Sequence, residues 1–292
     1  MFKGSNVALV TPFKNNKLDD DNYIELIHFH IKNGTNGLVP AGTTGESPTL
    51  SHKEHEKVIE LCINETKGKI PVIADCDTGY GGPNNVSHMV KKYESAGIAA
   101  ICIEDKTFPK QNSLLENGQN DLISEKEFVA KIIAAKEAKQ DKNFMIIARI
   151  EALISGAGMD EALKRATAYE KAGADAILIH SKKKTPEEVF EFAELWKGNS
   201  PIVVIPTTYD SVSLDELISH KIKIVIHANQ TFRAAHASMS RILKQMINSN
   251  SLSEVKEEIS SMEDIFHLQE MYNLKEKEIT SSEEADNEST NN

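Results

Sequence analysis

Eight short β-strand patterns alternate with amphipathic helical patterns along most of the chain, and this alternation constrains the fold more than any other feature. The expected strands lie at 6–10, 37–41, 71–75, 99–103, 144–149, 176–180, 201–206 and 222–226. Eight strand–helix units in about 270 residues are typical of a (β/α)8 barrel, the TIM-barrel fold of the α/β class. An open doubly wound sheet is the alternative, but its usual glycine-rich phosphate turn does not follow the first strand. We therefore predict one barrel over residues 1–274.

The helical segments between these strands have recognisable ends. Ser51 with Glu54 has the spacing of a capping box, which satisfies backbone N–H groups at a helix N-terminus. The same spacing recurs in residues 124–127. Gly97 and Gly173 follow helical patterns and precede strands, as glycines do when they end a helix. These signals support the expected alternation.

Composition excludes several classes of function. The net charge of −11, with no basic patch to offset it, argues against a nucleic-acid partner. No run of about 18 apolar residues occurs, so we expect no membrane span and no membrane partner. The three cysteines, Cys62, Cys76 and Cys102, lie in apolar patterns and are expected to be reduced core residues of a cytoplasmic protein. Residues 275–292 are acidic and poor in apolar side chains, so we expect a disordered tail.

Three acidic residues follow two neighbouring strands. Asp75 and Asp77 are two positions apart, so in an extended strand they point to the same side, and Glu104 follows the next strand. Carboxylates held side by side repel each other unless a cation or a proton lies between them. Mg²⁺ prefers such oxygen ligands. We therefore predict a Mg²⁺ site at these three residues; solvated strand-end carboxylates are the alternative.

Further polar residues follow the other strands. The turn after the second strand contains Thr43, Thr44 and Gly45, whose hydroxyl and backbone N–H groups suit a carboxylate or phosphate ligand. An ordinary βα loop is the alternative for that turn. Later strands are followed by Lys110, Asn112, Arg149, Glu151, His180 and Asn229. The active site of a (β/α)8 barrel lies at the C-terminal ends of its strands, so we predict the site at these positions.

From about residue 71 to residue 274 the chain resembles the phosphoenolpyruvate mutase family of the isocitrate lyase superfamily. Residues 75–81, Asp-Cys-Asp-Thr-Gly-Tyr-Gly, match the family's Asp-x-Asp-Thr-Gly-Tyr-Gly strand. Residues 104–113, Glu-Asp-Lys-Thr-Phe-Pro-Lys-Gln-Asn-Ser, match its gating-loop signature, Glu-Asp-Lys-x-Phe-Pro-Lys-x-Asn-Ser. Residues 148–152 and 173–182 match its fifth and sixth units.

The first 70 residues resemble a different (β/α)8 family, dihydrodipicolinate synthase. This likeness lies in residues 2–13 and in Gly-Thr-Thr-Gly-Glu-Ser-Pro-Thr-Leu at 42–50. The mutase family's own Trp-Gly-Ser-Gly-Leu turn is missing. The chain is therefore interpreted as a barrel chimera whose two resemblances meet near the third expected strand. The synthase resemblance implies that Thr43 and Thr44 hold a pyruvyl carboxylate.

The mutase resemblance implies an isomerase that interconverts phosphoenolpyruvate and phosphonopyruvate. It implies that Asp75 binds Mg²⁺ directly, while Asp77 and Glu104 hold its water ligands. The migrating phosphoryl group would be bound by Lys110, Asn112, Arg149 and His180. Substrate contacts are expected from Thr43, Thr44, Gly45, Glu151 and Asn229. The resemblance also implies a homodimer or homotetramer that exchanges its C-terminal helix, expected at 231–248.

Other activities remain open at this point. A phosphonopyruvate hydrolase of the same superfamily would usually carry Thr where this chain has Asn112. The superfamily's 2-oxo acid lyases usually carry a cysteine in the gating loop, and residues 107–120 contain none. Synthase chemistry requires a desolvated lysine on the sixth strand, and residues 176–180 contain none. A barrel that binds pyruvate-like acids without turnover is the further alternative.

Overall fold

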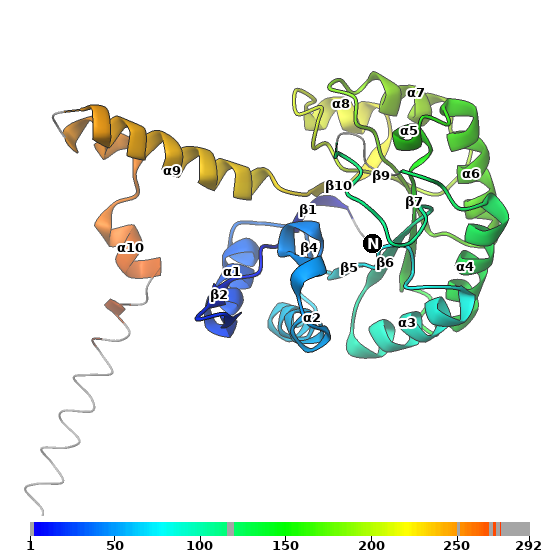
Figure 1. Cartoon of the computed structure of the whole chain (residues 1–292), viewed down its shortest axis with the longest axis horizontal. Coiled ribbons are helices and arrows are strands. Elements are labelled where there is room, and N and C mark those ends of the chain that lie inside the picture. The colour runs from blue at the N-terminus through cyan, green and yellow to red at the C-terminus, as the bar shows by residue number, and fades with distance from the viewer. Residues whose placement is uncertain (1–2, 116–119, 250–251, 269–270, 273–274, 276–292) are drawn as a thin grey trace, which may run out of the picture. The chain divides into compact units, whose positions relative to one another are not determined.

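The computed structural model describes residues 3–115, 120–249, 252–268, 271–272 and 275, and Figure 1 shows the chain as a cartoon. Two compact units make up the chain, Met1–Gln230 and Thr231–Asn292. The acidic tail predicted for residues 275–292 lies outside the described residues except for Lys275.

One parallel sheet forms the framework of the first unit. Its strands are β1 (Gly4–Ala8), β4 (Gly37–Val39), β5 (Ile73–Asp75), β6 (Ala100–Glu104), β7 (Met145–Ile150), β8 (Ala176–Ile179), β9 (Ile202–Val204) and β10 (Ile222–His227). They pair in the order β4-β1-β10-β9-β8-β7-β6-β5. A parallel bridge between Leu38 and Val72 joins β4 to the segment that leads into β5. The (β/α)8 barrel predicted from the alternation is confirmed.

The join between β4 and β5 is the sparsest strand pairing in the described barrel. It consists of the single Leu38–Val72 bridge, whereas β6 and β7 share five register pairs. The backbone N–H of Leu38 also donates to the carbonyl of Pro71 at 3.0 Å. Residue 71, near which we expected the resemblance to change from one family to the other, therefore lies at this join.

Helices surround the strands, as Figure 1 shows. They are α1 (Asp20–Lys32), α2 (His52–Thr66), α3 (Pro83–Ala96), α4 (Glu125–Ala138), α5 (Ala152–Ser155), α6 (Met159–Ala172), α7 (Glu187–Leu195) and α8 (Leu214–Ser219). Ser51 and Glu54 form the predicted capping box of α2. Gly97 and Gly173 end α3 and α6 in the left-handed conformation, as expected. A short hairpin, β2 (Phe13–Lys14) with β3 (Lys17–Leu18), was not expected.

Alternation along each strand separates two hydrophobic layers. In β6, Ala100 and Cys102 belong to a cluster that also contains Ile73 and Ile147 from the neighbouring strands. Ile101, between Ala100 and Cys102, belongs to the larger cluster that includes the helices. Successive side chains on a strand point to opposite faces. The smaller cluster therefore fills the barrel interior, and every second residue towards the strand ends continues inward.

The second unit begins with the long helix α9 (Gln230–Asn248), followed by a short 3-10 helix, Leu252–Glu258, and α10 (Met262–Leu268). Arg241 Nε and Gln245 Nε2 each lie 2.8 Å from the carboxylate of Glu258. The apolar side chains of Phe232 and Met239 on α9 are exposed. The predicted amphipathic helix at 231–248 is present.

Two expectations from composition can be compared with the structure. Cys62, Cys76 and Cys102 are buried free thiols, as predicted. In the part of the chain that the structure describes, no helix combines the length and the apolarity needed to cross a bilayer.

Candidate active site

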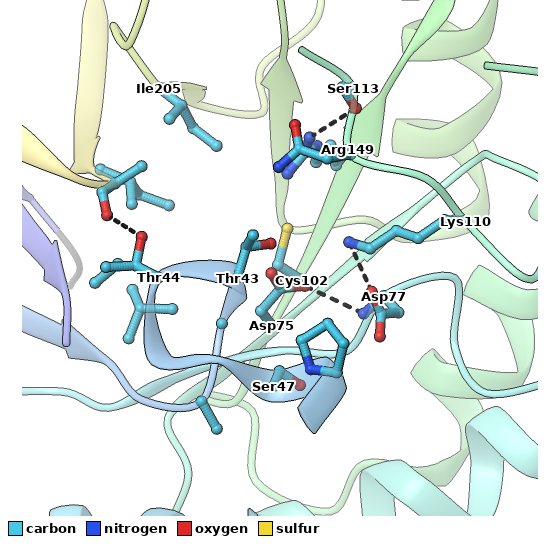
Figure 2. Close-up of a pocket in the computed structure, with 18 of the residues that line it drawn as sticks. Thr43, Thr44, Ser47, Asp75, Asp77, Cys102, Lys110, Ser113, Arg149 and Ile205 are labelled. Atoms are coloured by element: carbon cyan, nitrogen blue, oxygen red, sulfur yellow. Dashed lines mark hydrogen bonds and ion pairs between the residues drawn. The ribbon is translucent and has the colours of Figure 1, made fainter. Parts of the chain in front are cut away.

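A cavity of about 850 Å³ lies at the C-terminal ends of the strands. Of the residues predicted for the site, the following line it: Thr43, Thr44, Asp75, Asp77, Lys110, Asn112, Arg149, His180 and Asn229. Figure 2 shows how several of these side chains converge from different strands and loops. Their convergence follows from strand parity, because Asp75, Arg149 and His180 lie two residues beyond inward-facing Ile73, Ile147 and Leu178.

The first group of side chains surrounds the ammonium group of Lys110. Lys110 Nζ lies 2.6 Å from the Asp77 carboxylate and 3.4 Å from that of Glu104. Burial by itself would lower the pKa of Lys110, but Asp75, Glu104 and Asp77 outweigh it and raise the pKa well above its usual range. Lys110 is therefore a fixed positive charge, and the carboxylates around it form a site that attracts cations.

The backbone of this acidic group is held in an unusual conformation. Asp77 has a left-handed φ of 50°, although it is not a glycine. Its N–H donates to Asp75 Oδ1 at 3.1 Å, so the Asp75 carboxylate lies against the backbone of Asp77. Backbone strain of this kind occurs where surrounding contacts hold a functional residue in place.

Glu104 lies behind the cavity lining rather than in it. Its side chain is 1% exposed, and its Oε2 is 3.3 Å from Arg149 Nε. Its Oε1 is buried and has no hydrogen-bond partner within the described residues. Burial raises the pKa of Glu104 against the opposing charges of Arg149 and Lys110. A buried carboxylate oxygen without a partner is costly, so this atom is suited to accept from an ordered water or a ligand.

The second group consists of Arg149, Glu151 and His180. Arg149 Nε lies 2.6 Å from Glu151 Oε1, and the same oxygen lies 2.8 Å from His180 Nδ1. Burial would raise the pKa of Glu151, but Arg149 and His180 outweigh it and the pKa lies below its usual range. Glu151 is fully buried and does not line the cavity. Its carboxylate therefore orients the arginine and the histidine from behind.

His180 presents its other ring nitrogen for ligand binding. Nδ1 contacts both Glu151 and Arg149 Nη2, the latter at 2.9 Å. Burial and the charge of Arg149 lower the pKa of His180, so the ring is neutral near pH 7. A neutral imidazole has one N–H, so Nδ1 can accept from Arg149 only when the proton is on Nε2, and Nε2–H is then the donor for a ligand. The pair is suited to bind oxygens of an anionic group.

The hydroxyl groups of Thr43 and Thr44, in the turn after β4, have different surroundings. Thr44 Oγ1 donates to the carbonyl of Ala228, beyond β10. Thr43 is exposed in the cavity and lies beside Asp75 in Figure 2. Gly45 is buried, and a Cβ there would lie 2.9 Å from the carbonyl oxygen of Leu9. Gly45 therefore allows the turn to pack closely, and Thr43 is the hydroxyl placed towards a ligand.

The side-chain amides of Asn112 and Asn229, two other predicted site residues, differ in their hydrogen bonds. Asn112 accepts from the Leu114 N–H at 2.9 Å through Oδ1, which leaves its amide nitrogen as the donor for a ligand. Asn229 Oδ1 is buried and has no hydrogen-bond partner in the described part of the chain. Both residues line the cavity.

Some cavity residues were missed by sequence reasoning. His52 and His55 lie in a helical pattern and were not among the predicted site residues, yet both line the cavity from α2. Burial lowers the pKa of His55, against the attraction of Asp77. The distance of these two histidines from the strand ends depends on how α2 packs against the barrel. Helical periodicity in the sequence does not predict this packing.

The donor set limits how a metal could bind. Among the residues that the structure describes, no three His, Cys, Asp or Glu side chains are placed to bind one metal ion together. A metal held by one of these carboxylates would complete its coordination with water and substrate oxygens. Mg²⁺ commonly binds in this way.

Comparison with known proteins identifies the family. The phosphoenolpyruvate phosphomutase family model matches residues 41–247. The phosphoenolpyruvate phosphomutase of Tetrahymena pyriformis is 43% identical over 231 residues, which cover 79% of this chain and 76% of that protein. The phosphonopyruvate hydrolase of Variovorax sp. (strain Pal2) is 44% identical over 201 residues, 68% of this chain and 69% of that protein.

A segment of the chain is also similar to a protein of another family. The 4-hydroxy-tetrahydrodipicolinate synthase of Pelagibacter ubique (strain HTCC1062) is 56% identical over 119 residues, which cover 40% of each protein. Together with the 231 residues matched by the Tetrahymena protein, this exceeds the 292 residues of the chain. The two likenesses therefore share some residues, and the synthase likeness covers only a segment.

Solved structures agree with the family match. The crystal structure of a phosphoenolpyruvate phosphomutase from Streptomyces platensis subsp. rosaceus has a TM-score of 0.77 and 36% identity, covering 96% of this chain and 95% of that chain. A phosphonopyruvate hydrolase in complex with oxalate and Mg²⁺ has a TM-score of 0.72 and 33% identity, covering 94% and 93%. With its barrel and cavity, this chain belongs to the phosphoenolpyruvate phosphomutase family.

Proposed function

We propose that this protein is a Mg²⁺-dependent phosphoenolpyruvate mutase, which interconverts phosphoenolpyruvate and phosphonopyruvate. The observation that supports this most strongly is the placement of Arg149 and His180 together with the carboxylates and Lys110 around one cavity. Such a site offers donors for an anionic phosphoryl group and acidic oxygens for a cation. Phosphoryl transfer requires mainly positioning and charge neutralisation, and these residues can supply both.

The residues around Asp75 fit a magnesium ion. Asp75 would bind it directly, while Asp77 and the buried, unpartnered Oε1 of Glu104 would hold its water ligands. The bound metal would neutralise the pyruvyl oxygens of the substrate. Thr43 would donate to the pyruvyl carboxylate. A hydrolase with 33% identity to this chain was crystallised with oxalate and Mg²⁺, which supports the choice of metal.

The phosphoryl group would lie between the second group of side chains and the loop. Arg149 and His180 would donate to its oxygens, and Glu151 would keep both in position. Lys110 and the amide of Asn112 would contact it from the loop that follows β6. These contacts would also exclude water, because an intramolecular transfer succeeds only when water cannot attack phosphorus first.

Synthase chemistry is not supported by the charge state of the lysines. Lys110 lines the cavity, but its pKa is raised, and a Schiff base requires a neutral amine. Lys182, beyond β8, is exposed and donates to the carbonyl of Ile154. Lys110 is therefore not a neutral nucleophile, and Lys182 is not desolvated.

Phosphonopyruvate hydrolysis is the second candidate, because the Variovorax hydrolase is as similar as the Tetrahymena mutase. Asn112 favours transfer, since its amide can hold the phosphoryl group in place. The test is ³¹P NMR of phosphonopyruvate incubated with the protein and Mg²⁺. We expect phosphoenolpyruvate to form; free phosphate would indicate the hydrolase, and no change would indicate a barrel that only binds.

We also propose that the protein is a homodimer or homotetramer in which α9 is exchanged between subunits. Helix α9 is 19 residues long and has no buried residue. Its apolar residues Phe232, Met239 and Leu243 are each more than half exposed. Covering such a face against a second copy would remove a large apolar area from water.

A further inference from the structure

Lys106 is a fully buried lysine at the base of the loop that carries Lys110 and Asn112. Its side chain is 1% exposed, and it follows β6 by two residues. An antiparallel bridge pairs Lys106 with Leu122, where the chain returns from the loop. The N–H of Thr107 also donates to the carbonyl of Asp121 at 2.9 Å. Lys106 therefore lies where the loop leaves and rejoins the barrel.

The ammonium group of Lys106 makes three contacts with this loop. Nζ donates to the carbonyl of Gln111 at 2.6 Å, to Asn120 Oδ1 at 2.9 Å and to Ser113 Oγ at 3.3 Å. An ammonium has three N–H donors, so these acceptors match its capacity. Gln111 lies between Lys110 and Asn112 in the sequence. The contact with its carbonyl therefore holds the backbone between the two side chains that would touch the phosphoryl group.

Ser113 connects this lysine to the phosphoryl-binding pair. Ser113 Oγ donates to Glu151 Oε2 at 2.7 Å, so its lone pairs remain to accept from Lys106. Glu151 in turn contacts His180 and Arg149. A continuous series of hydrogen bonds thus runs from Arg149 through Glu151 and Ser113 to Lys106 and the loop.

Burying a charge of this kind is costly unless every donor is satisfied. Burial lowers the pKa of Lys106, although Glu104 and Glu151 oppose that effect. An apolar residue of similar length could fill the same volume without that cost. The benefit of the charge is that one side chain joins three positions of the loop, Gln111, Ser113 and Asn120.

We propose that Lys106 is a positioning residue that holds the loop over the site and thereby directs the phosphoryl group to the pyruvyl unit instead of to water. This inference rests on the proposed mutase function. In the mutase direction the C–P bond of phosphonopyruvate breaks, its electron pair remains on the pyruvyl unit as the enolate, and the enolate oxygen bonds to phosphorus. In the competing reaction a water oxygen bonds to phosphorus and loses a proton, and C3 of the enolate gains one. The products are then phosphate and pyruvate.

The test compares Lys106→Met with wild type by ³¹P NMR of phosphonopyruvate turnover. We expect mutase turnover to fall by about 10²-fold, the scale for misplacing a catalytic group by about 1 Å. The ratio of phosphate to phosphoenolpyruvate should rise at the same time. Affinity for Mg²⁺–oxalate should stay within a few-fold, because oxalate has no phosphoryl group for the loop to bind. A folded Lys106→Met protein with wild-type turnover and product ratio would overturn the proposal.

Lys139→Met is the matched control. Lys139 is also largely buried and donates to the Phe144 carbonyl and to Asp175 Oδ2, each at 2.8 Å. Phe144 and Asp175 precede β7 and β8, at the end of the barrel away from the site. This variant should lose stability but keep the wild-type product ratio. An equal change of product ratio in Lys139→Met would show that Lys106 acts only through general stability.

Two further measurements test the role of Lys106 if Lys106→Met does not fold or if wild type has no turnover. If Lys106→Met does not fold, Asn120→Ala removes one acceptor and should shift the product ratio in the same direction by a smaller factor. Hydrogen exchange in residues 107–115 reports loop order without any turnover, and it should accelerate in Lys106→Met but not in Lys139→Met. If wild type makes no phosphoenolpyruvate, the proposed function fails, and unchanged exchange in that loop would separately overturn the role of Lys106.

Discussion

The hydroxyl of Thr44 donates a hydrogen bond to the backbone carbonyl of Ala228, 184 residues further along the chain. Thr44 lies in the turn after β4, and Ala228 follows β10. The bond therefore joins two βα loops that lie far apart in the sequence. It also occupies the donor of Thr44, so only Thr43 of the two threonines has its hydroxyl proton for a ligand.

The structural role of Thr44 and the ligand-binding role of Thr43 can be tested with two matched substitutions. Thr44→Val should lower the free energy of unfolding by about 1 kcal/mol, because the Ala228 carbonyl loses its donor, and should change Mg²⁺–oxalate affinity little. Thr43→Val should leave stability within about 0.5 kcal/mol but weaken Mg²⁺–oxalate binding by about tenfold, since a hydrogen bond to a charged group is lost. Urea unfolding and calorimetric titration measure the two quantities. The reverse assignment would show that Thr44 is the ligand.

Asp75 should be indispensable for metal binding. In wild type, Mg²⁺ at about 100 times its Kd should add about 2.7 kcal/mol of stability, and Asp75→Ala should abolish this gain. Asp77→Asn should weaken Mg²⁺ binding by only about tenfold, because Asp77 acts through a water ligand. Thermal unfolding with increasing Mg²⁺ measures both effects. Equal stabilisation of Asp75→Ala and wild type would place the metal elsewhere.

Asn112 should matter for transfer and not for binding of the pyruvyl end. Asn112→Ala should reduce mutase turnover by about 10²-fold, the usual loss when one positioned donor is removed. Affinity for Mg²⁺–oxalate should remain close to that of wild type. Steady-state kinetics beside calorimetry separates the two quantities. Turnover within a few-fold of wild type would mean that the loop only connects two elements.

Helix α9 should mediate assembly. Wild type should have the mass of a dimer or tetramer by light scattering, and Met239→Glu should weaken the assembly by placing a charge in its apolar face. Lys244→Glu, five residues later on the same helix, is the control and should leave the mass unchanged. A monomeric wild type would contradict helix exchange.

Local patterns were sufficient to predict the barrel and the side chains at its rim. Strand parity places Asp75, Arg149 and His180 inward once Ile73, Ile147 and Leu178 are known to face the barrel interior. The carboxylates were predicted from their spacing at the strand ends, and the loop from its resemblance to the mutase family.

Relations between loops could not be predicted in the same way. Glu151 was expected to bind substrate, but it lies behind Arg149 and His180, because the backbone turns after β7. His52 and His55 reach the cavity through the packing of α2. Lys106 contacts residues of its loop up to 14 positions away. Each depends on distances that no periodic pattern encodes.

The central claim is that the chain transfers a phosphoryl group within its substrate, and the early product ratio tests it most directly. Wild-type protein with phosphonopyruvate and Mg²⁺ should give phosphoenolpyruvate as the first and dominant ³¹P signal, and chelation of the metal should stop its formation. Free phosphate as the main early product, or binding of Mg²⁺ and oxalate without any conversion, would contradict a mutase.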